Sequence, residues 1–384
     1  MKNNNQYYNF GYNKFGPFLY GFSRWLDKNL NKHAYDKVFF FARDGYMMIK
    51  ATKLICPNDL GKEYVYFSRK SICQALLYDT NTLEDSLRYI SKEKYISYGK
   101  LLEYFGFNYK EAKNICLLNE IDIDEELEFT NILNNKTVKK IYSLLKEKIN
   151  KKSKNQANLL KQYLKQISFK GNIAIVDIGW YGSMQYYLEK FAKMHNIPVH
   201  ITGYYVGIEQ SDNVIGNCYG YVYSKKNLKR KKDLLCCFGL LERLFQSREG
   251  STLGYRLEKN KVVPTLDNYE YKDDKELIQH IKDMQVGALN FVKVNLSNKL
   301  ENMDLINPLI NAGKSPTLSE TKLFKDYYLM DGSKIFFIPQ KAIYKYSIKE
   351  FVHALSNSPW KTGFMKAAFK IDFPYYKIYS LLKK

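Results

Sequence analysis

Residues 37–48 read KVFFFARDGYMM, and this short stretch decides the fold. The run VFFFA, residues 38–42, is entirely apolar and has the length of a strand that is buried on both faces, as strands of parallel sheets are. Helix-forming residues follow immediately, so we expect a helix over residues 46–55. The Arg-Asp-Gly sequence at 43–45 therefore occupies a short loop at the carboxyl end of a buried strand.

Two further stretches show the same order of apolar strand, short polar loop and helix. The run YVYF at 64–67 precedes Ser68-Arg69-Lys70, and the run IAIVD at 173–177 precedes a turn with two glycines. A helix over 183–194 and a strand over 201–208 are expected next. Strands that alternate with helices in this way predict an α/β protein with a parallel sheet.

The periodicity also predicts how the chain is divided. We expect a split α/β core made of residues 1–78 and 169–255, because long polar helical patterns interrupt the strand signals between them. Residues 79–168 would form an inserted helical subdomain. Residues 256–384 would form a mainly helical C-terminal region that ends in a tail of alternating aromatic and basic residues.

Composition limits the classes of partner and compartment. Lys and Arg number 60 against 39 Asp and Glu, a net charge of +21, which suits polyanionic partners such as nucleic acid, anionic lipid or phosphorylated substrates. The alternative is a general enrichment in Lys, Asn, Ile and Tyr that makes no site. The basic residues are dispersed and no nucleic-acid-reading motif is present, so nucleic acid is not expected.

Cysteine usage and hydropathy favour a cytoplasmic protein. The six cysteines form neither a CxxC pair nor a spaced Cys/His set, so the sequence predicts no zinc module and no disulfide framework. No window approaches the roughly 20 apolar residues of a membrane span, and the first residues lack the apolar core of a signal peptide. We expect a cytoplasmic location, with peripheral contact at the inner membrane face as an alternative.

The loops at the strand ends are where a ligand is expected. In an open parallel sheet, ligands bind beyond the carboxyl ends of the strands, where exposed N–H groups and helix N-termini favour phosphate. Arg43 would hold an anionic oxygen, Asp44 would act as a metal ligand or acid/base group, and Gly45 would let the backbone approach the ligand. The alternative is that Arg43 and Asp44 only pair with each other and cap the helix.

The other strand-end loops would complete this site. Asp177 would join Asp44 in holding Mg²⁺ or moving protons, and Arg69 and Lys70 would bind phosphate oxygens. The remaining candidate residues that bind substrate or phosphate are Ser68, Gly182, Ser183 and Glu242, with the loop of residues 249–251 beside them.

Five stretches of the sequence, taken together, resemble a known family. They are FGPFLYGFSRWL, VFFFARDGYMM, YVYFSRKS, IAIVDIGWYGSMQ and LLERLFQSREGSTLGY, in that order, and they cover most of the first 255 residues. The chain is similar to the predicted hydrolases of the haloacid-dehalogenase (HAD) superfamily found among surface-polysaccharide biosynthesis proteins. The resemblance implies a HAD-like, Rossmann-like core that acts on a phosphorylated sugar or nucleotide-sugar during assembly of capsule, lipopolysaccharide or a related glycan.

The catalytic motif of that superfamily is incomplete in this chain. HAD phosphatases use DxDGT, and on this pattern Ala42 takes the place of the nucleophilic Asp, Asp44 that of the acid/base Asp, Gly45 that of the glycine and Tyr46 that of the threonine. In the later motifs of the superfamily, Ser68 takes the place of the hydroxyl residue and Lys70 that of the phosphate-binding cation. Asp177 takes the place of the acid that binds the metal. Alanine cannot form an aspartyl-phosphate, so any hydrolase or transferase activity would need other chemistry.

Two other functions remain open at this point. The order of elements also resembles a phosphoribosyltransferase core, although VDIGWYGS has one Asp where that family's acidic motif has two. Alternatively, the chain is a non-catalytic scaffold of a membrane-associated glycan-assembly complex. For that role the tail offers an apolar helical stripe, whose more usual fate is packing into a core; it consists of Trp360, Phe364, Ala368 and Ile371.

Overall fold

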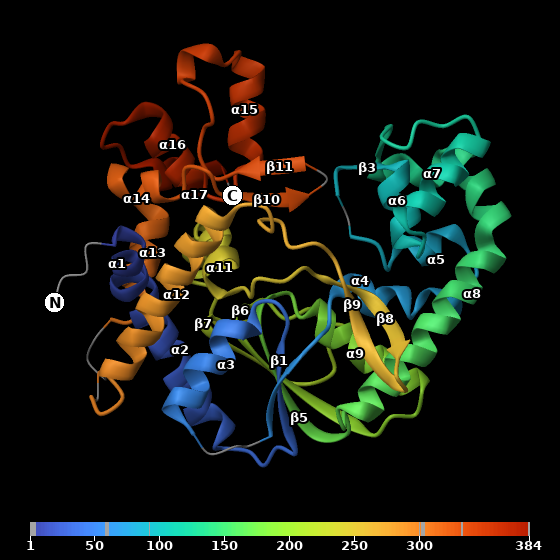
Figure 1. The fold of residues 1–384 in the computed structure, drawn as a ribbon, viewed down its shortest axis with the longest axis horizontal. Coiled ribbons are helices and arrows are strands. Elements are labelled where there is room, and N and C mark those ends of the chain that lie inside the picture. The colour runs from blue at the N-terminus through green and yellow to red at the C-terminus, as the bar shows by residue number, and fades with distance from the viewer. Residues whose placement is uncertain are drawn as a thin grey trace.

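The centre of the molecule is a five-stranded sheet in which every neighbouring pair of strands is parallel. The computed structural model describes residues 5–57, 61–91, 93–298, 300, 304–331 and 333–382. The strand order is β2-β1-β5-β6-β7 (Figure 1). The strands are β1 (Lys37–Phe41), β2 (Lys62–Val65), β5 (Gly171–Trp180), β6 (Val199–Ile208) and β7 (Cys218–Tyr223). The predicted α/β class with a Rossmann-like parallel sheet is confirmed.

Helices cover both faces of the sheet, which is why the inner strand β1 has apolar side chains on both faces. Val38 and Phe40 of β1 belong to one hydrophobic core, whereas Phe39 and Phe41 belong to the other. The first core also contains residues of α2 (Gly16–Leu30), α3 (Gly45–Ile55), α11 (Phe238–Phe245) and α12 (Lys275–Val294). The second contains residues of α4 (Arg69–Gln74), α8 (Lys136–Gln166) and α9 (Ser183–Met194). Figure 1 shows these two groups of helices on opposite sides of the sheet.

The segment between β2 and β5 is mainly helical, and its elements lie to one side of the sheet (Figure 1). The longest of them is α8, with 31 residues, whose apolar side packs in the second core. The other elements are α5 (Leu83–Leu87), β3 (Tyr95–Ser97), α6 (Tyr98–Tyr104), α7 (Tyr109–Leu118) and β4 (Glu126–Glu128), with short 3₁₀ turns at Leu77–Asp79 and Phe129–Asn134.

The chain after β7 returns to the first face, packs a hairpin of residues 252–266 on the second core, and then builds a helical region beside the first face. Its elements are α10 (Lys231–Cys236), α11, β8 (Thr252–Glu258), β9 (Lys261–Leu266), α12, α13 (Asn307–Lys314), α14 (Leu318–Leu323), β10 (Tyr328–Asp331), β11 (Ser333–Phe336), α15 (Ile348–Asn357), α16 (Lys361–Phe369) and α17 (Tyr375–Leu382). At the other end, α1 (Gln6–Phe10) and a π-helical turn (Gly11–Phe15) lead into α2. Residues from both ends of the chain thus share one core.

The aromatic stripe of the tail packs inward for the most part. Trp360 is completely buried and its indole N–H donates to the carbonyl oxygen of Gly313 at 3.0 Å, and Phe364 is also buried. The helix ends at Lys370, which adopts a left-handed conformation, so Ile371 lies beyond it and is exposed. Among the described residues, no helix has the length and apolar character that crossing a membrane requires.

Candidate functional site

The sheet reverses its winding direction between β1 and β5. The chain passes from β1 through α3 to β2 on one side, and from β5 through α9 to β6 on the other, with α3 and α9 on opposite faces. In such sheets the helices diverge at the reversal and leave a crevice at the carboxyl ends of the two strands. Asp44 follows β1 and Asp177 lies near the end of β5, so both predicted acids lie at this edge of the sheet, which is called the crevice below.

Three carboxyl groups influence one another there. Burial raises the pKa of Asp177 to about 8, and the neighbouring charge of Asp44 adds to the increase. Burial also raises the pKa of Glu242 to about 8, again with a contribution from Asp44 and a smaller one from Asp177. Burial raises the pKa of Asp44 to about 6, although Arg43 and Gln246 act in the opposite direction. The structure therefore brings Asp44, Asp177 and the predicted Glu242 into one electrostatic cluster.

Arg43 does not pair with Asp44 as the capping alternative requires. Its Nη1 lies 2.7 Å from Oε2 of Glu270, while Nη1 of Arg243 lies 2.5 Å from the other carboxylate oxygen. Burial alone would raise the pKa of Glu270, but Arg243 and Arg43 lower it below its usual value. Glu270 thus stays ionised between two arginines, and this Arg-Glu-Arg triad places net positive charge near Asp44 and Glu242.

Several buried polar atoms of the crevice have no hydrogen-bond partner among the described residues. They are Oδ1 of Asp44, Oε1 of Gln246 and Nε of Arg243. The other end of the Gln246 side chain donates from Nε2 to Glu242. Because buried polar atoms are almost always paired, such a group of unsatisfied atoms marks a place where a ligand, ion or water is expected.

The backbone on both sides of the crevice is tightly constrained. A Cβ atom on Gly45 would lie 2.8 Å from the carbonyl carbon of Phe40, so only glycine fits at the start of α3. After Asp177, Gly179, Trp180 and Gly182 have φ values of +112°, +82° and +72°. A tryptophan in the left-handed region is uncommon, and residues held in such conformations cluster at functional sites. Gly182 forms the N-cap of α9 and Ser183 is its first residue.

Arg43 and Glu270 also line an open pocket of about 680 Å³ beside the β10–β11 hairpin. Tyr269, Lys272 and Lys334 contribute aromatic and basic side chains to its wall. The volume suits a small-molecule ligand. A ligand in this pocket would contact Arg43 and Glu270, the two members of the triad that line it.

The residues predicted after β2 lie elsewhere and have other partners. Ser68 caps α4, accepting from the N–H of Ser71 and donating to the carbonyl oxygen of Thr252 at 2.5 Å. Lys70 pairs with Glu103 at 3.4 Å. Arg69 lies over the ring of Tyr187, with its guanidinium carbon 5.9 Å from the ring centroid, and lines a different pocket. None of the three contacts the acidic cluster in any interaction found among the described residues.

The loop after α11 is likewise used in packing. Glu249 accepts hydrogen bonds from the hydroxyls of Tyr64 at 2.6 Å, Tyr66 at 3.3 Å and Ser247 at 2.8 Å. The N–H of Ser247 donates to the carbonyl oxygen of Arg43 at 3.1 Å. This loop therefore fixes the position of Arg43 and leaves the crevice acids to other elements.

Sequence reasoning missed Arg243, Gln246 and Glu270. A signal existed for the first two, because LLERLFQ places charged and amide side chains inside an otherwise apolar helix. Glu270 lies between β9 and α12 in a segment that is rich in acids and tyrosines, and nothing in that pattern distinguishes it from its neighbours.

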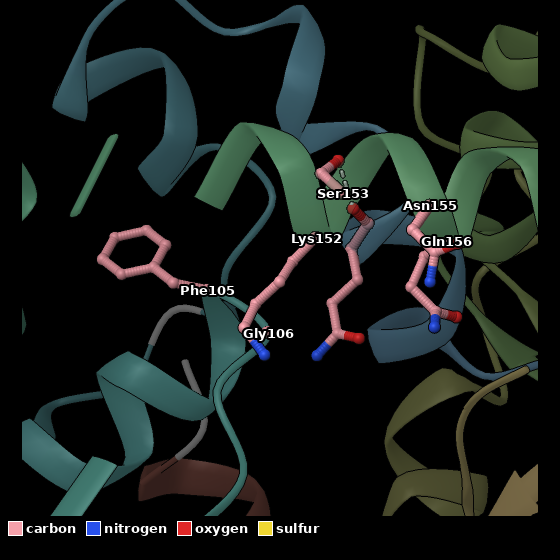
Figure 2. Close-up of a pocket in the computed structure, with 7 residues that line it drawn as sticks. Phe105, Gly106, Lys152, Ser153, Asn155 and Gln156 are labelled. Atoms are coloured by element: carbon pink, nitrogen blue, oxygen red, sulfur yellow. Dashed lines mark hydrogen bonds between the residues drawn. The ribbon is translucent and has the colours of Figure 1, made fainter. Parts of the chain in front are cut away.

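A smaller cavity of about 140 Å³ lies where α8 meets the end of α6, and it differs in kind from the crevice (Figure 2). Ser153 donates to the carbonyl oxygen of Gln74 at 2.6 Å, and Lys152 is paired with Glu111 at 2.8 Å. Its wall contains amides, a hydroxyl and a neutralised lysine, but no carboxylate. The arrangement is a polar packing defect between the insertion and the core.

No group of three or more His, Cys, Asp or Glu side chains is arranged to hold a metal ion within the part of the chain that the structure describes. Two carboxylates can nevertheless suffice for Mg²⁺, which commonly takes its other ligands from water and substrate phosphate. The unpaired Oδ1 of Asp44 is consistent with such a partial set of ligands.

Comparison with protein-family models and with curated proteins gave no match to this chain.

Proposed function

We propose that the chain binds a phosphorylated sugar or nucleotide-sugar in the crevice between β1 and β5, and that it acts in the biosynthesis of a surface polysaccharide. The observation that carries the binding proposal is the cluster of Asp44, Asp177 and Glu242 at the winding reversal of the sheet, with one buried oxygen of Asp44 unpaired. The glycan context comes from the resemblance of the five sequence stretches.

The pKa values divide the roles of the three acids. Near neutral pH, Asp177 and Glu242 with pKa values of about 8 would be largely protonated, whereas Asp44 with a pKa of about 6 would be largely ionised. When their surroundings give neighbouring carboxyl groups different pKa values, the group with the higher pKa can act as a general acid and the group with the lower pKa as a general base. Asp177 or Glu242 would donate a proton to a leaving oxygen, and Asp44 would accept one from the attacking group.

Direct attack by the protein on phosphorus does not fit this site. Ala42 stands where a nucleophilic Asp would be needed, so transfer or hydrolysis would proceed by attack of an acceptor hydroxyl or of water. The Arg43-Glu270-Arg243 triad would attract the phosphate through its net positive charge. If Mg²⁺ is bound, Asp44 and Asp177 would both be ionised to hold it, and Glu242 would be the remaining proton donor. The ion would supply further positive charge to the phosphate oxygens.

Calorimetric titration with a panel of nucleotide-sugars and sugar phosphates, with and without Mg²⁺, tests this function. We expect binding by the unaltered chain and at least a tenfold loss in Asp44→Asn and Asp177→Asn if a metal bridges them to phosphate. Asp212→Asn is the matched control, because this carboxylate is exposed on the surface and forms an ion pair with Lys225 there. Equal binding by all three variants would contradict a site at the crevice.

A second candidate function is a scaffold that docks on an anionic membrane. Tyr344, in the 3₁₀ turn at Ile343–Lys345 before α15, and Ile348 and Val352 of α15 form a ridge of apolar side chains that are 81%, 86% and 57% exposed. Lys345 and Lys349 flank this ridge and are exposed as well. Exposed apolar side chains beside lysines are typical of helices that lie in an anionic lipid interface.

Sedimentation with vesicles of phosphatidylglycerol and phosphatidylcholine tests the scaffold function. Partitioning that falls in the double variant Ile348→Ser/Val352→Ser, and falls again at high salt, would support membrane docking. Partitioning by the variant equal to that of the unaltered chain would exclude this ridge.

A further inference from the structure

A second pocket lies at the carboxyl edge of the sheet, between the insertion and α9, and the crevice acids do not line it. Its volume is about 700 Å³, within the usual range for small-molecule sites. Residues from α4, from the segment 79–89 and from the first two turns of α9 form its wall. It is therefore assembled only when the insertion packs on the core.

Three basic side chains line this pocket, and two of them have no carboxylate partner. Neither Arg69 nor Lys190 forms a salt bridge with any described acid, while Arg88 makes only a long one, at 3.5 Å, to Asp85. Arg69 donates a long hydrogen bond of 3.4 Å to the carbonyl oxygen of Ile90, and its buried Nε has no hydrogen-bond partner among the described residues. A guanidinium whose N–H groups are not all hydrogen-bonded, next to a lysine without a carboxylate partner, is suited to binding a phosphate.

Tyrosine rings stand directly next to these cations. Tyr186 is half-buried in the first turn of α9, and its ring centroid is 5.0 Å from that of Tyr187. Tyr187 in turn donates its hydroxyl to the carbonyl oxygen of Arg88 at 3.0 Å, which holds it in place. The ammonium of Lys190 lies 5.0 Å from the ring centroid of Tyr89. A planar ring could stack on Tyr186 while an anion attached to it reaches the cations.

Two acids in the same wall argue against a simple inorganic anion. Asp79 and Asp85 line the pocket together with Asn213, and carboxylates accept hydrogen bonds from hydroxyl groups. A ligand that satisfies cations, aromatic rings and carboxylates needs a charged group, a planar group and hydroxyls. We propose that this pocket binds a nucleotide, with its phosphates on Arg69 and Lys190, its base on Tyr186 and its ribose hydroxyls on Asp79. The proposal does not depend on the function proposed for the crevice.

Calorimetric titration of the full chain with uridine diphosphate, inorganic diphosphate and ribose 5-phosphate tests the pocket. We expect uridine diphosphate to bind more tightly than either fragment. Arg69→Gln should weaken that binding by about 10- to 100-fold, because a charged hydrogen bond contributes about 1.5–3 kcal/mol. Lys190→Gln should weaken it less, about 3- to 10-fold, because an ammonium contacts phosphate as a point charge and not as a bidentate fork. Lys193→Gln removes the same charge from an exposed position of the same helix and should leave the affinity unchanged.

The variants also decide between the two sites. Because Arg69 is partly packed against Tyr187, circular dichroism of Arg69→Gln checks that it folds, and Lys190→Gln repeats the test at a second cation of the pocket. Nucleotide binding that survives both substitutions but is lost in Asp44→Asn would place the nucleotide in the crevice and overturn the proposal. Absence of binding by the unaltered chain, or equal affinity for inorganic diphosphate, would also overturn it.

Discussion

Asp177 is the residue whose surroundings are most at odds with its usual charge. It is 7% exposed, has Asp44 as a neighbour, and its pKa is about 8 instead of the usual value near 4. The folded chain therefore holds a proton there between about pH 4 and pH 8 that the unfolded chain releases. Stability contributed by the protonated form is present at the acid end of this range and is lost as the pH rises.

We expect the free energy of unfolding, measured in urea with EDTA present, to fall between pH 5 and pH 8. Asp177→Asn removes the titrating group, so its stability should change less over this range and exceed that of the unaltered chain at pH 8 by about 1–3 kcal/mol. Asp212→Asn, on the surface, should follow the unaltered chain. Parallel curves for all three would show that Asp177 titrates normally.

Glu270 differs from Asp177 because it stays ionised and its charge is paired with two arginines. It holds two arginines, and the side chain of Arg243 is only 3% exposed. Glu270→Gln would leave both guanidinium groups in the interior without their counter-charge, which typically costs about 3–5 kcal/mol. Chemical denaturation should show this loss, whereas Glu258→Gln, which breaks the exposed pair with Arg256, should change stability by less than about 1 kcal/mol. Equal effects would mean that the triad adds nothing.

Among the elements, β1 and α3 show how a short sequence fixes the site. Helix α3 begins at Gly45 directly against the end of β1, and Asp44 before it lies close enough to β5 for its charge to raise the pKa of Asp177. Gly45→Ala should destabilise the chain by about 1–3 kcal/mol, because the added methyl group meets the backbone of Phe40. Lys50→Ala, at an exposed position of the same helix, is the control in thermal unfolding. A neutral Gly45→Ala would show that the helix can shift.

The elements of the core were predictable because each carries a local signal. Continuous apolar runs predicted β1, β5 and β6 to within a few residues, and the glycine turn predicted α9 at its observed bounds. The strand β7 was not predicted, since CYGYVY alternates weakly and gains its role only by pairing with β6. Asp44 and Asp177 could be paired from sequence because parallel strands end at one edge. The exclusion of Arg69 from their cluster could not, because it depends on the direction in which one long side chain extends.

At the level of the whole molecule, the C-terminal region is part of the same core as the sheet. Trp360 is fully buried against α13 and α14, and its ring centroid lies 5.4 Å from that of Phe324. Trp360→Ala should destabilise the whole chain by about 3–5 kcal/mol in a single cooperative transition. Tyr344→Ala removes an exposed ring and is the control. A separate early transition for the tail would show that it folds as an independent unit.

The insertion separates two neighbouring strands by a long stretch of chain, and this separation affects how the sheet folds during translation. β1 ends at residue 41, whereas β5, which pairs with it, begins at residue 171. During translation β1 and β2 leave the ribosome well before their partner, so an unpaired sheet edge persists while the intervening helices form. The edge of β1 therefore stays without its partner strand until about 180 residues have emerged.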